Sequence, residues 1–410
     1  MTRRVLISGA GVAGPALAFW LKAGGFEPTL IEKAPSLRSG GYVIDFWGHG
    51  YDLAESMGLL PAIDRAGYHI KELRIVNDDG NKLAGFGTSV FRELTGGRYI
   101  TLPRSELSRL LFEKIERSSE VIFDTEVESL DQDTNGVSVQ LSHGAIRRFD
   151  LVIGADGLHS RVRELAFGPL ARFERRLGYT VAAFEAPRYR PRDEDIYLMY
   201  GQPGRMLGRV SLRDDRTLFL FVFAGVPEPF PATQDAQKAV IRERYADVTW
   251  EVPAILAELD RAEDIYFDRV SQVRMPHWSQ GRVALLGDAA FCVSLLAGQG
   301  SALAMISAYV LAGELAKAGG MHPSAFAGYE ALLRSYIERK QAAAERFASA
   351  FAPRTRWGLT FRNLVINAFA IPGLARWAIG RDISDRITLP EYSWGAEAQH
   401  LDQSRAFFLS

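Results

Sequence analysis

The opening of the chain places two short apolar runs on either side of a helical stretch. Residues 3–8 and 28–32 contain Val, Leu, Ile and Thr, which favour β-strands, and the residues between them favour a helix. Neighbouring parallel strands require a crossover connection of this kind. The pattern therefore predicts the first βαβ unit of a parallel sheet.

A second helix and further strands are expected in the next hundred or so residues. Residues 104–118 repeat apolar side chains on one helical face from Leu107 to Ile115, with Ser105 as the expected N-cap. Strand-like runs follow at 120–130, 136–141 and 147–153.

The pattern changes between residues 178 and 225, where short apolar runs are separated by Gly, Pro, Asp and Arg. This spacing is typical of an antiparallel sheet. A buried parallel strand is expected again at 281–288, followed by a helix, and residues from 322 onward favour helices until a polar tail.

The predicted fold class is therefore α/β: a Rossmann-like nucleotide-binding domain interrupted by a β-rich domain and followed by a C-terminal helical segment. We expect the nucleotide-binding domain at 1–72, 98–175 and 272–320, the β-rich domain at 73–97 and 176–271, and the helical region at 321–410.

Composition narrows the class of protein. The 410 residues are 47% hydrophobic and 24% charged, as in ordinary globular proteins, and the net charge of −1 gives no electrostatic reason to expect nucleic acid or anionic membranes as partners. The single cysteine, Cys292, excludes an intramolecular disulfide framework and suits a reducing cytoplasm. No Cys and His spacing indicates a metal site. The apolar segment 357–380 is interrupted by polar residues, which favours a buried or amphipathic segment over a membrane span.

The stretch RRVLISGAGVAGPALAFW, residues 3–20, fits either a secretory signal or a dinucleotide site. No cleavage region follows it. Instead Gly9, Gly11 and Gly14 form G-x-G-x-x-G between two predicted strands, and Glu32 follows at the distance of a ribose-binding acid. This favours a nucleotide site, with a pyrophosphate at the helix N-terminus.

Two further motifs lie where predicted strands end. Asp156 and Gly157 bring polar backbone close to a dinucleotide, with Arg161 and Arg163 supplying charge, or they simply form a turn. Asp288 follows the strand at 281–288 and is either a ligand for a sugar hydroxyl or a helix cap. The run Gly298-Gln299-Gly300 opens a helix whose N–H groups face an anionic atom, unless it is only a loop.

Together and in this order, these motifs resemble the single-component flavin monooxygenases of the para-hydroxybenzoate hydroxylase type, over most of residues 1–320. The resemblance is closest to their tetracycline-inactivating branch. It rests on LIEKAPSLRSGGYVIDFWGHG, LPRSELSRLL, SQVRMPHWSQGRVALLGDAA and LAGQGSALAMISAYVLAGEL.

The resemblance implies an FAD-binding domain and a β-rich substrate domain. FAD is expected to be non-covalent, because no attachment motif is evident. The implied cofactor residues are Gly9, Gly11, Val12, Ala13, Gly14, Glu32, Lys33, Arg38, Asp45, Arg104, Val127, Asp156, Gly157, Asp288, Leu295, Gly298, Gln299, Gly300 and Ser301. Three positions depart from the family pattern: Phe291 replaces a histidine, Ser294 and Leu295 occupy the place of a proline, and Ala302 replaces an asparagine.

The activity so implied is hydroxylation of an aromatic or polycyclic phenolic compound, tetracycline-like or polyketide-like, through a C4a-peroxyflavin. O2 and NAD(P)H are the co-substrates, and NAD(P)H binds transiently because the chain has no second G-x-G-x-x-G. No catalytic side chain is assigned, because the flavin performs the chemistry. A flavin dehydrogenase or oxidase and a ligand-sequestering flavoprotein remain alternatives; the W-x-W of flavin halogenases is missing.

The predicted substrate contacts come from the β-rich domain, where Arg209 is a candidate to orient a carbonyl or phenolate. The apolar candidates are Phe184, Met199, Met206, Phe219, Phe221 and Phe223. We expect a cytoplasmic monomer or homodimer without stable membrane insertion.

Overall fold

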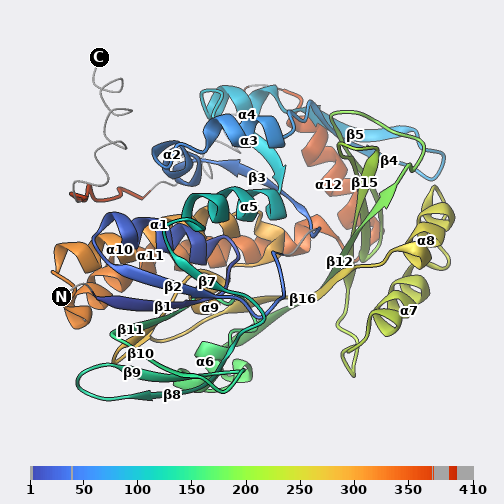
Figure 1. The fold of residues 1–410 in the computed structure, drawn as a ribbon. Coiled ribbons are helices and arrows are strands. Elements are labelled where there is room, and N and C mark those ends of the chain that lie inside the picture. The colour runs from blue at the N-terminus through green and yellow to red at the C-terminus, as the bar shows by residue number, and fades with distance from the viewer. Residues whose placement is uncertain (1–2, 38–39, 372, 374–386, 395–410) are drawn as a thin grey trace.

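The computed structural model describes residues 3–37, 40–371, 373 and 387–394 (Figure 1). A six-stranded sheet with the order β17-β18-β11-β1-β2-β7 organises the nucleotide-binding part, and only β17 runs antiparallel to its neighbour. Its strands are β1 (Arg4–Ser8), β2 (Glu27–Ile31), β7 (Glu120–Ile122), β11 (Leu151–Gly154), β17 (Ser279–Gln280) and β18 (Val283–Leu285). Because β2 and β11 flank β1, the carboxyl end of β1 lies where α/β sheets bind ligands.

Three helices pack in succession against this sheet. Helix α1 (Ala13–Ala23) contacts α10 (Gly300–Lys317), and α10 contacts α11 (His322–Phe351) (Figure 1). Helix α5 (Arg104–Ile115) covers α1 on another side. It begins directly after Pro103, so the expectation that Ser105 caps it is wrong: β6 leads into the helix without a capping side chain.

The β-rich part is a seven-stranded sheet with the order β16-β12-β15-β14-β13-β4-β5. Its strands are β4 (Glu72–Val76), β5 (Lys82–Gly87), β12 (Glu174–Pro187), β13 (Ile196–Gln202), β14 (Arg205–Ser211), β15 (Arg216–Ala224) and β16 (Tyr266–Val273). All neighbours are antiparallel except β4 and β13. The predicted α/β class with an inserted antiparallel sheet is confirmed, and the proposed domain boundaries stay a prediction.

The two faces of this sheet have different coverings. Helices α7 (Gln234–Tyr245) and α8 (Val252–Arg261) pack on the outer face, at the right of Figure 1. The inner face carries Met199, Met206 and Val222, which pack against Leu295 and Leu296 in the short helix η2 (Leu295–Ala297). Because strand side chains alternate, one sheet therefore serves as a structural core outside and as a surface toward the nucleotide-binding part inside.

A two-stranded antiparallel sheet, β3 (Val43–Trp47) with β6 (Tyr99–Pro103), lies between these parts of the molecule. Ile44, Phe46, Ile100 and Leu102 point into the core of the nucleotide-binding part. The alternate residues, Asp45 among them, therefore point to the opposite side.

Strands β8 (Val127–Gln132), β9 (Val137–Leu141) and β10 (Ile146–Phe149) form a separate three-stranded antiparallel sheet with the order β10-β9-β8. The remaining elements are α2 (His49–Ser56), α3 (Leu60–Ala66), α4 (Ser89–Leu94), α6 (Arg161–Phe167), η1 (Leu170–Arg172), α9 (Asp288–Phe291) and α12 (Arg356–Ala368).

The C-terminal region is only partly helical. Helix α12 is amphipathic: Ile366 packs beneath the seven-stranded sheet, whereas Trp357 is 86% exposed. The stretch 387–394 is not helical but lies against the nucleotide-binding core, where the Tyr392 ring occupies the space a Cβ on Gly313 would need. Of the helices in the described ranges, none has the length and apolar character to cross a bilayer.

Helix α2 approaches α10 so closely that a side chain at Gly50 has no room. A Cβ on Gly50 would lie 2.7 Å from the Cβ of Ala302. We predict that Gly50→Ala lowers the thermal unfolding midpoint, at a cost of about 1–3 kcal/mol for overpacking. Gly24→Ala is the control, since the nearest atoms to its Cβ would lie at 3.4 Å, an ordinary van der Waals distance. Equal midpoints for Gly50→Ala and the wild type would contradict the packing argument.

Candidate functional site

Two glycines in and after the loop that follows β1 leave no room for a side chain. Gly9 has φ +110°, and a Cβ there would lie 2.5 Å from the carbonyl oxygen of Ala155. A Cβ on Gly14 would lie 1.9 Å from the carbonyl oxygen of Gly9, so α1 packs directly on the turn. A Cβ on Gly11 would meet only a guanidinium nitrogen of Arg104, at 3.6 Å. The backbone at Gly11 is thus open to a ligand beside a positive charge.

The N-terminus of α1 has N–H groups available for that ligand. Its N-cap, Val12, provides no side-chain hydrogen bond, and the first turn, starting at Ala13, contains no acidic residue. Unpaired N–H groups at a helix start favour an anion.

Glu32 stands at the end of β2, next to this loop. Its Oε2 accepts a hydrogen bond from the Ala10 N–H at 2.8 Å, and its Oε1 accepts one from the Ala34 N–H at 3.0 Å. Each oxygen retains acceptor capacity, since a carboxylate has about four acceptor sites. These two bonds hold the carboxylate in place, and its role in binding a ribose hydroxyl stays a prediction. Lys33 is exposed, and Arg38 lies outside the described residues.

Asp156 is close to Gly9, but its carboxylate is engaged within the protein. It accepts hydrogen bonds from Ser160 Oγ and from the N–H groups of Arg161 and Val162, at 2.5, 2.8 and 3.1 Å. Asp156 therefore supports the start of α6 together with the N-cap Ser160, whose hydroxyl accepts a hydrogen bond from the Arg163 N–H. Gly157 takes φ +79° in the turn. This geometry fits the turn interpretation, and a cofactor contact of Asp156 or Gly157 stays a prediction.

The two arginines after this turn do not supply charge to a cofactor. Arg163 is buried and donates hydrogen bonds to the carbonyl oxygens of Ala289 and Leu158. Arg161 forms a surface ion pair with Glu164. Both expectations are corrected, because α6 turns these side chains toward backbone and solvent.

Asp288 connects the end of strand β18 with the glycine run that opens α10. It begins α9 after β18, and a Cβ on Gly300 would lie 3.7 Å from its Oδ1, so the carboxylate faces the N-terminus of α10. That N-terminus has no side-chain cap at Gln299 and no acid in its first turn, where Ser301 is buried and Gly298 has φ +66°. Burial raises the pKa of Asp288, and the neighbouring Arg104 offsets only part of this effect.

Two tyrosines, Tyr42 and Tyr266, lie next to Arg104 and Asp288, and the sequence patterns do not point to either of them. Tyr42 precedes β3 and Tyr266 begins β16; their ring centroids are 5.7 Å apart. Burial raises the pKa of Tyr42 to about 12. Burial by itself lowers the pKa of Arg104. The nearby Tyr42 and Asp288 outweigh this effect, so the pKa of Arg104 is raised. The only sequence signal was the pair Gly40-Gly41 before Tyr42.

Arg104 lies near enough to Tyr42, Tyr266 and Asp288 to interact electrostatically with each of them. All four side chains keep part of their surface exposed to solvent. We call the surface that these four residues share the central hollow. It extends from the start of α10, which Asp288 faces, to Tyr266 of the seven-stranded sheet.

The residues that depart from the family pattern have packing roles. Phe291 is buried against Trp278, with ring centroids 4.7 Å apart. Ala302 faces Gly50 of α2, which leaves no space for an asparagine side chain. Leu295 packs among the inner-face residues of the seven-stranded sheet. Val127 is fully buried in the nucleotide-binding core.

The predicted substrate residues are divided between the two faces of the sheet. Met199 and Met206 lie on the inner face. The phenylalanines pack on the outer face under α7 and α8, so they form core instead of a lining: Phe184, Phe219, Phe221 and Phe223. Arg209 is also directed outward, paired with Asp193 and Glu251. Strand alternation separates these residues from the methionines and corrects the prediction of one aromatic lining.

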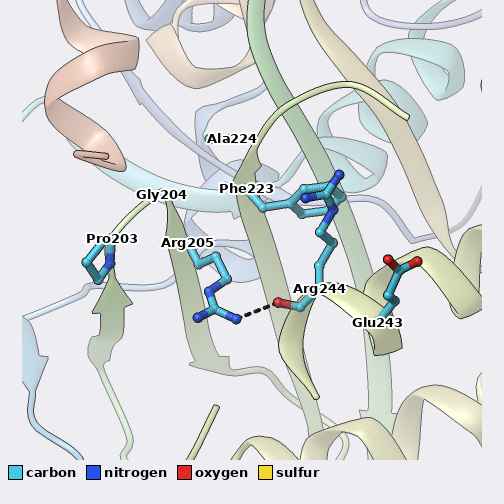
Figure 2. Close-up of a pocket in the computed structure, with 7 residues that line it drawn as sticks. All are labelled: Pro203, Gly204, Arg205, Phe223, Ala224, Glu243 and Arg244. Carbon is cyan, nitrogen blue, oxygen red and sulfur yellow. Dashed lines mark hydrogen bonds between the residues drawn. The ribbon is translucent and has the colours of Figure 1, made fainter. Parts of the chain in front are cut away.

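A pocket of about 350 Å³ lies where β14 begins and β15 ends, beside α7 (Figure 2). Arg205 there donates to the backbone carbonyl of Arg244 at 2.8 Å, and the Arg244 guanidinium lies over the Phe223 ring. This pocket belongs to the outer face and contains none of the motif residues of the central hollow.

The residues around the central hollow fit FAD. An open backbone at Gly11, two helix starts without capping side chains, a fixed acid at Glu32 and the pair of Arg104 and Asp288 suit a pyrophosphate, a ribose and a polar linker.

Comparison with known proteins shows the family to which this protein belongs. A model of the FAD binding domain family matches residues 2–350, and the chain belongs to that family. An uncharacterised protein of Mycobacterium tuberculosis is 40% identical over 350 residues, 83% of this chain and 92% of that protein. A flavin-dependent monooxygenase of Legionella longbeachae is 32% identical over 402 residues, 95% and 98% of the two chains.

The crystal structure of the tetracycline destructase Tet(51) has a TM-score of 0.82 at 31% identity, covering 96% of this chain and 100% of that one. The protein is thus an FAD-dependent monooxygenase, and the resemblance seen in its motifs is confirmed.

Asp288 and Asp156 permit a direct test of which acid serves the cofactor. We predict that Asp288→Ala weakens FAD binding about 10- to 100-fold, the value of a charge-assisted hydrogen bond, with little change in apoprotein stability. Asp156→Ala should instead lower apoprotein stability by about 0.5–2 kcal/mol through loss of a helix cap. FAD titration and thermal unfolding of both variants measure this. Unchanged FAD affinity in Asp288→Ala would show that Asp288 is only structural.

Proposed function

We propose that the protein hydroxylates an aromatic or polycyclic phenolic small molecule, tetracycline-like or polyketide-like, at the expense of NAD(P)H and O2. The observation that carries this proposal is the inner face of the seven-stranded sheet, where the phenol side chains of Tyr197 and Tyr266 stay partly exposed above the buried thioethers of Met199 and Met206. Such side chains suit a flat, partly polar ring system. The similarity to Tet(51) over 96% of the chain supports the same substrate class.

In this proposal FAD is held by the glycine loop and α1 at its pyrophosphate, by Glu32 at its ribose, and by Arg104 and Asp288 near its ribityl-phosphate linker. When bound and reduced, FAD supplies the activation of O2 and the transfer of one oxygen atom. The chain's own residues bind and orient. The N-terminus of α10 at Gly300 stabilises negative charge placed before it, since its first-turn N–H groups have no side-chain cap.

Exclusion of water is the other task of the chain. Leu295, Leu296 and Met206 pack together where η2 meets the inner face of the sheet, and the Tyr42–Tyr266 contact joins the sheet to the residues before β3. A dry surround protects a reactive oxygen donor from loss to solvent. NAD(P)H is expected to bind transiently, because the chain has a single G-x-G-x-x-G. We place the reaction in the cytoplasm on the grounds of the lone, buried Cys292.

A flavin oxidase is the second candidate, and one observation favours weighing it. Ser294 has φ +149°, a conformation that favours glycine, in the loop directly before α10, and the family proline is replaced there. If this loop admits water to the central hollow, the same fold yields hydrogen peroxide in place of product.

Substrate-dependent oxygen consumption distinguishes these functions. With FAD-loaded protein, NADPH or NADH and a panel of tetracyclines and polycyclic phenols, we predict that an active compound raises NAD(P)H and O2 consumption together. Its product should contain one atom from ¹⁸O-labelled dioxygen. Catalase-sensitive peroxide and unchanged compounds throughout the panel would instead establish the oxidase. Binding without any turnover would indicate sequestration.

A further inference from the structure

Asp45 is predicted to contact the cofactor, and that stays a prediction; the direction of its strand also points to a second role. In β3 the residues Ile44 and Phe46 enter the nucleotide-binding core, so Asp45 is on the opposite side of the two-stranded sheet. Val43, two residues earlier and on the same side, packs with Tyr197 and Tyr266 of the seven-stranded sheet. Asp45 therefore faces the inner face of the sheet that borders the central hollow.

One carboxylate oxygen of Asp45 is held rigidly. Its Oδ1 accepts hydrogen bonds from the Tyr99 hydroxyl at 2.8 Å and from the Thr101 hydroxyl at 2.6 Å. Both donors come from β6, which pairs with β3 so that Thr101 stands directly opposite Asp45. Within the part of the chain that the structure describes, the second oxygen, Oδ2, accepts no hydrogen bond.

The surroundings make this second oxygen unusual. Burial raises the pKa of Asp45 despite the two hydroxyl bonds, and no described cation forms an ion pair with it. Asp52 on the adjacent helix, by contrast, is paired with Arg98. Asp45 lies close enough to Tyr197 on the inner face of the sheet for the two to interact electrostatically, and each side chain keeps part of its surface exposed to solvent.

We propose that Asp45 Oδ2 accepts a hydrogen bond from a hydroxyl group of the phenolic substrate. The inference rests on the substrate class proposed above. A buried acceptor with an open position discriminates strongly, because a ligand without the hydroxyl leaves the oxygen desolvated and unpaired. Tyr99 and Thr101 are positioning residues: they fix Oδ1 and thereby aim Oδ2. Asp45 is thus a specificity residue for hydroxyl-bearing rings over their ethers.

The Asp45→Asn variant reverses the polarity of this position with little change in shape. Tyr99 and Thr101 both donate to the atom at Oδ1, so the amide oxygen must take that place. The amide NH2 then replaces Oδ2, and an acceptor becomes a donor. The internal hydrogen bonds survive, which favours normal folding and FAD content.

The test compares binding of 2-naphthol and 2-methoxynaphthalene to the FAD-loaded protein, followed by the change in flavin absorbance or fluorescence. We expect the wild type to bind the naphthol about 10- to 100-fold more tightly than its methyl ether. In Asp45→Asn the ratio should fall to near one, with unchanged FAD affinity. Glu251→Gln is the matched control, since Tyr189 donates to that carboxylate on the outer face of the same sheet, and its ratio should equal that of the wild type.

Each outcome decides the question. A wild-type ratio near one, or no binding of either compound, overturns the inference, and so does an unchanged ratio in Asp45→Asn. Loss of FAD in Asp45→Asn while Glu251→Gln retains it would assign Asp45 to the cofactor instead and also overturn it. Discrimination that depends on Asp45, without ¹⁸O incorporation into any compound of the panel, supports the inference and sinks only the monooxygenation of phenols.

Discussion

Helix α10 is fixed by backbone contacts that leave no room for additional carbon atoms. Ala302 at its beginning meets Gly50 of α2, and Gly313 near its end meets the Tyr392 ring. On a third side it packs against α1, whose own position is set by the contact of Gly14 with the carbonyl of Gly9. Because protein interiors have little free volume, such contacts fix the position of each helix relative to its neighbours. The N-termini of α1 and α10 are therefore placed relative to each other by close contacts at glycines.

The protein buries two carboxyl groups whose ionisation lowers the stability of the fold. Asp288 and Asp45 have pKa values raised by burial, so each ionised carboxylate has a folding cost at neutral pH. For an acid whose folded pKa is raised, that cost is small below its unfolded pKa and grows as pH rises through the folded pKa. Burial also raises the pKa of Asp156 despite its three internal hydrogen bonds, so a raised pKa does not by itself separate the three acids. They differ in position, because Asp288 faces the N-terminus of α10 and Asp45 Oδ2 accepts no hydrogen bond from the described residues. Perturbed acids with open positions are typical of functional sites.

The seven-stranded sheet shows how one element divides its roles. Its outer face holds a cluster of phenylalanines under α7 and α8, which gives rigidity, while methionines and tyrosines on its inner face meet η2 and the residues before β3. One face of the sheet is therefore structural core, and the other face meets the nucleotide-binding part of the molecule.

The sequence by itself determined the βαβ start, the G-x-G-x-x-G turn with Glu32, the strand before Asp288 and the helix at Gly300, because each depends on short-range periodicity and on glycine at particular positions. It also allowed the family to be recognised. Only the tertiary structure decided which of two strand faces meets the site. Phe221 and Met206 are equally apolar in sequence, yet strand alternation and the covering by α7 and α8 place them on opposite faces. The same holds for Asp45, whose direction depends on which face of a two-stranded sheet the core covers. Tyr42 and Tyr266 meet across more than 200 residues of chain, a contact that no local pattern contains.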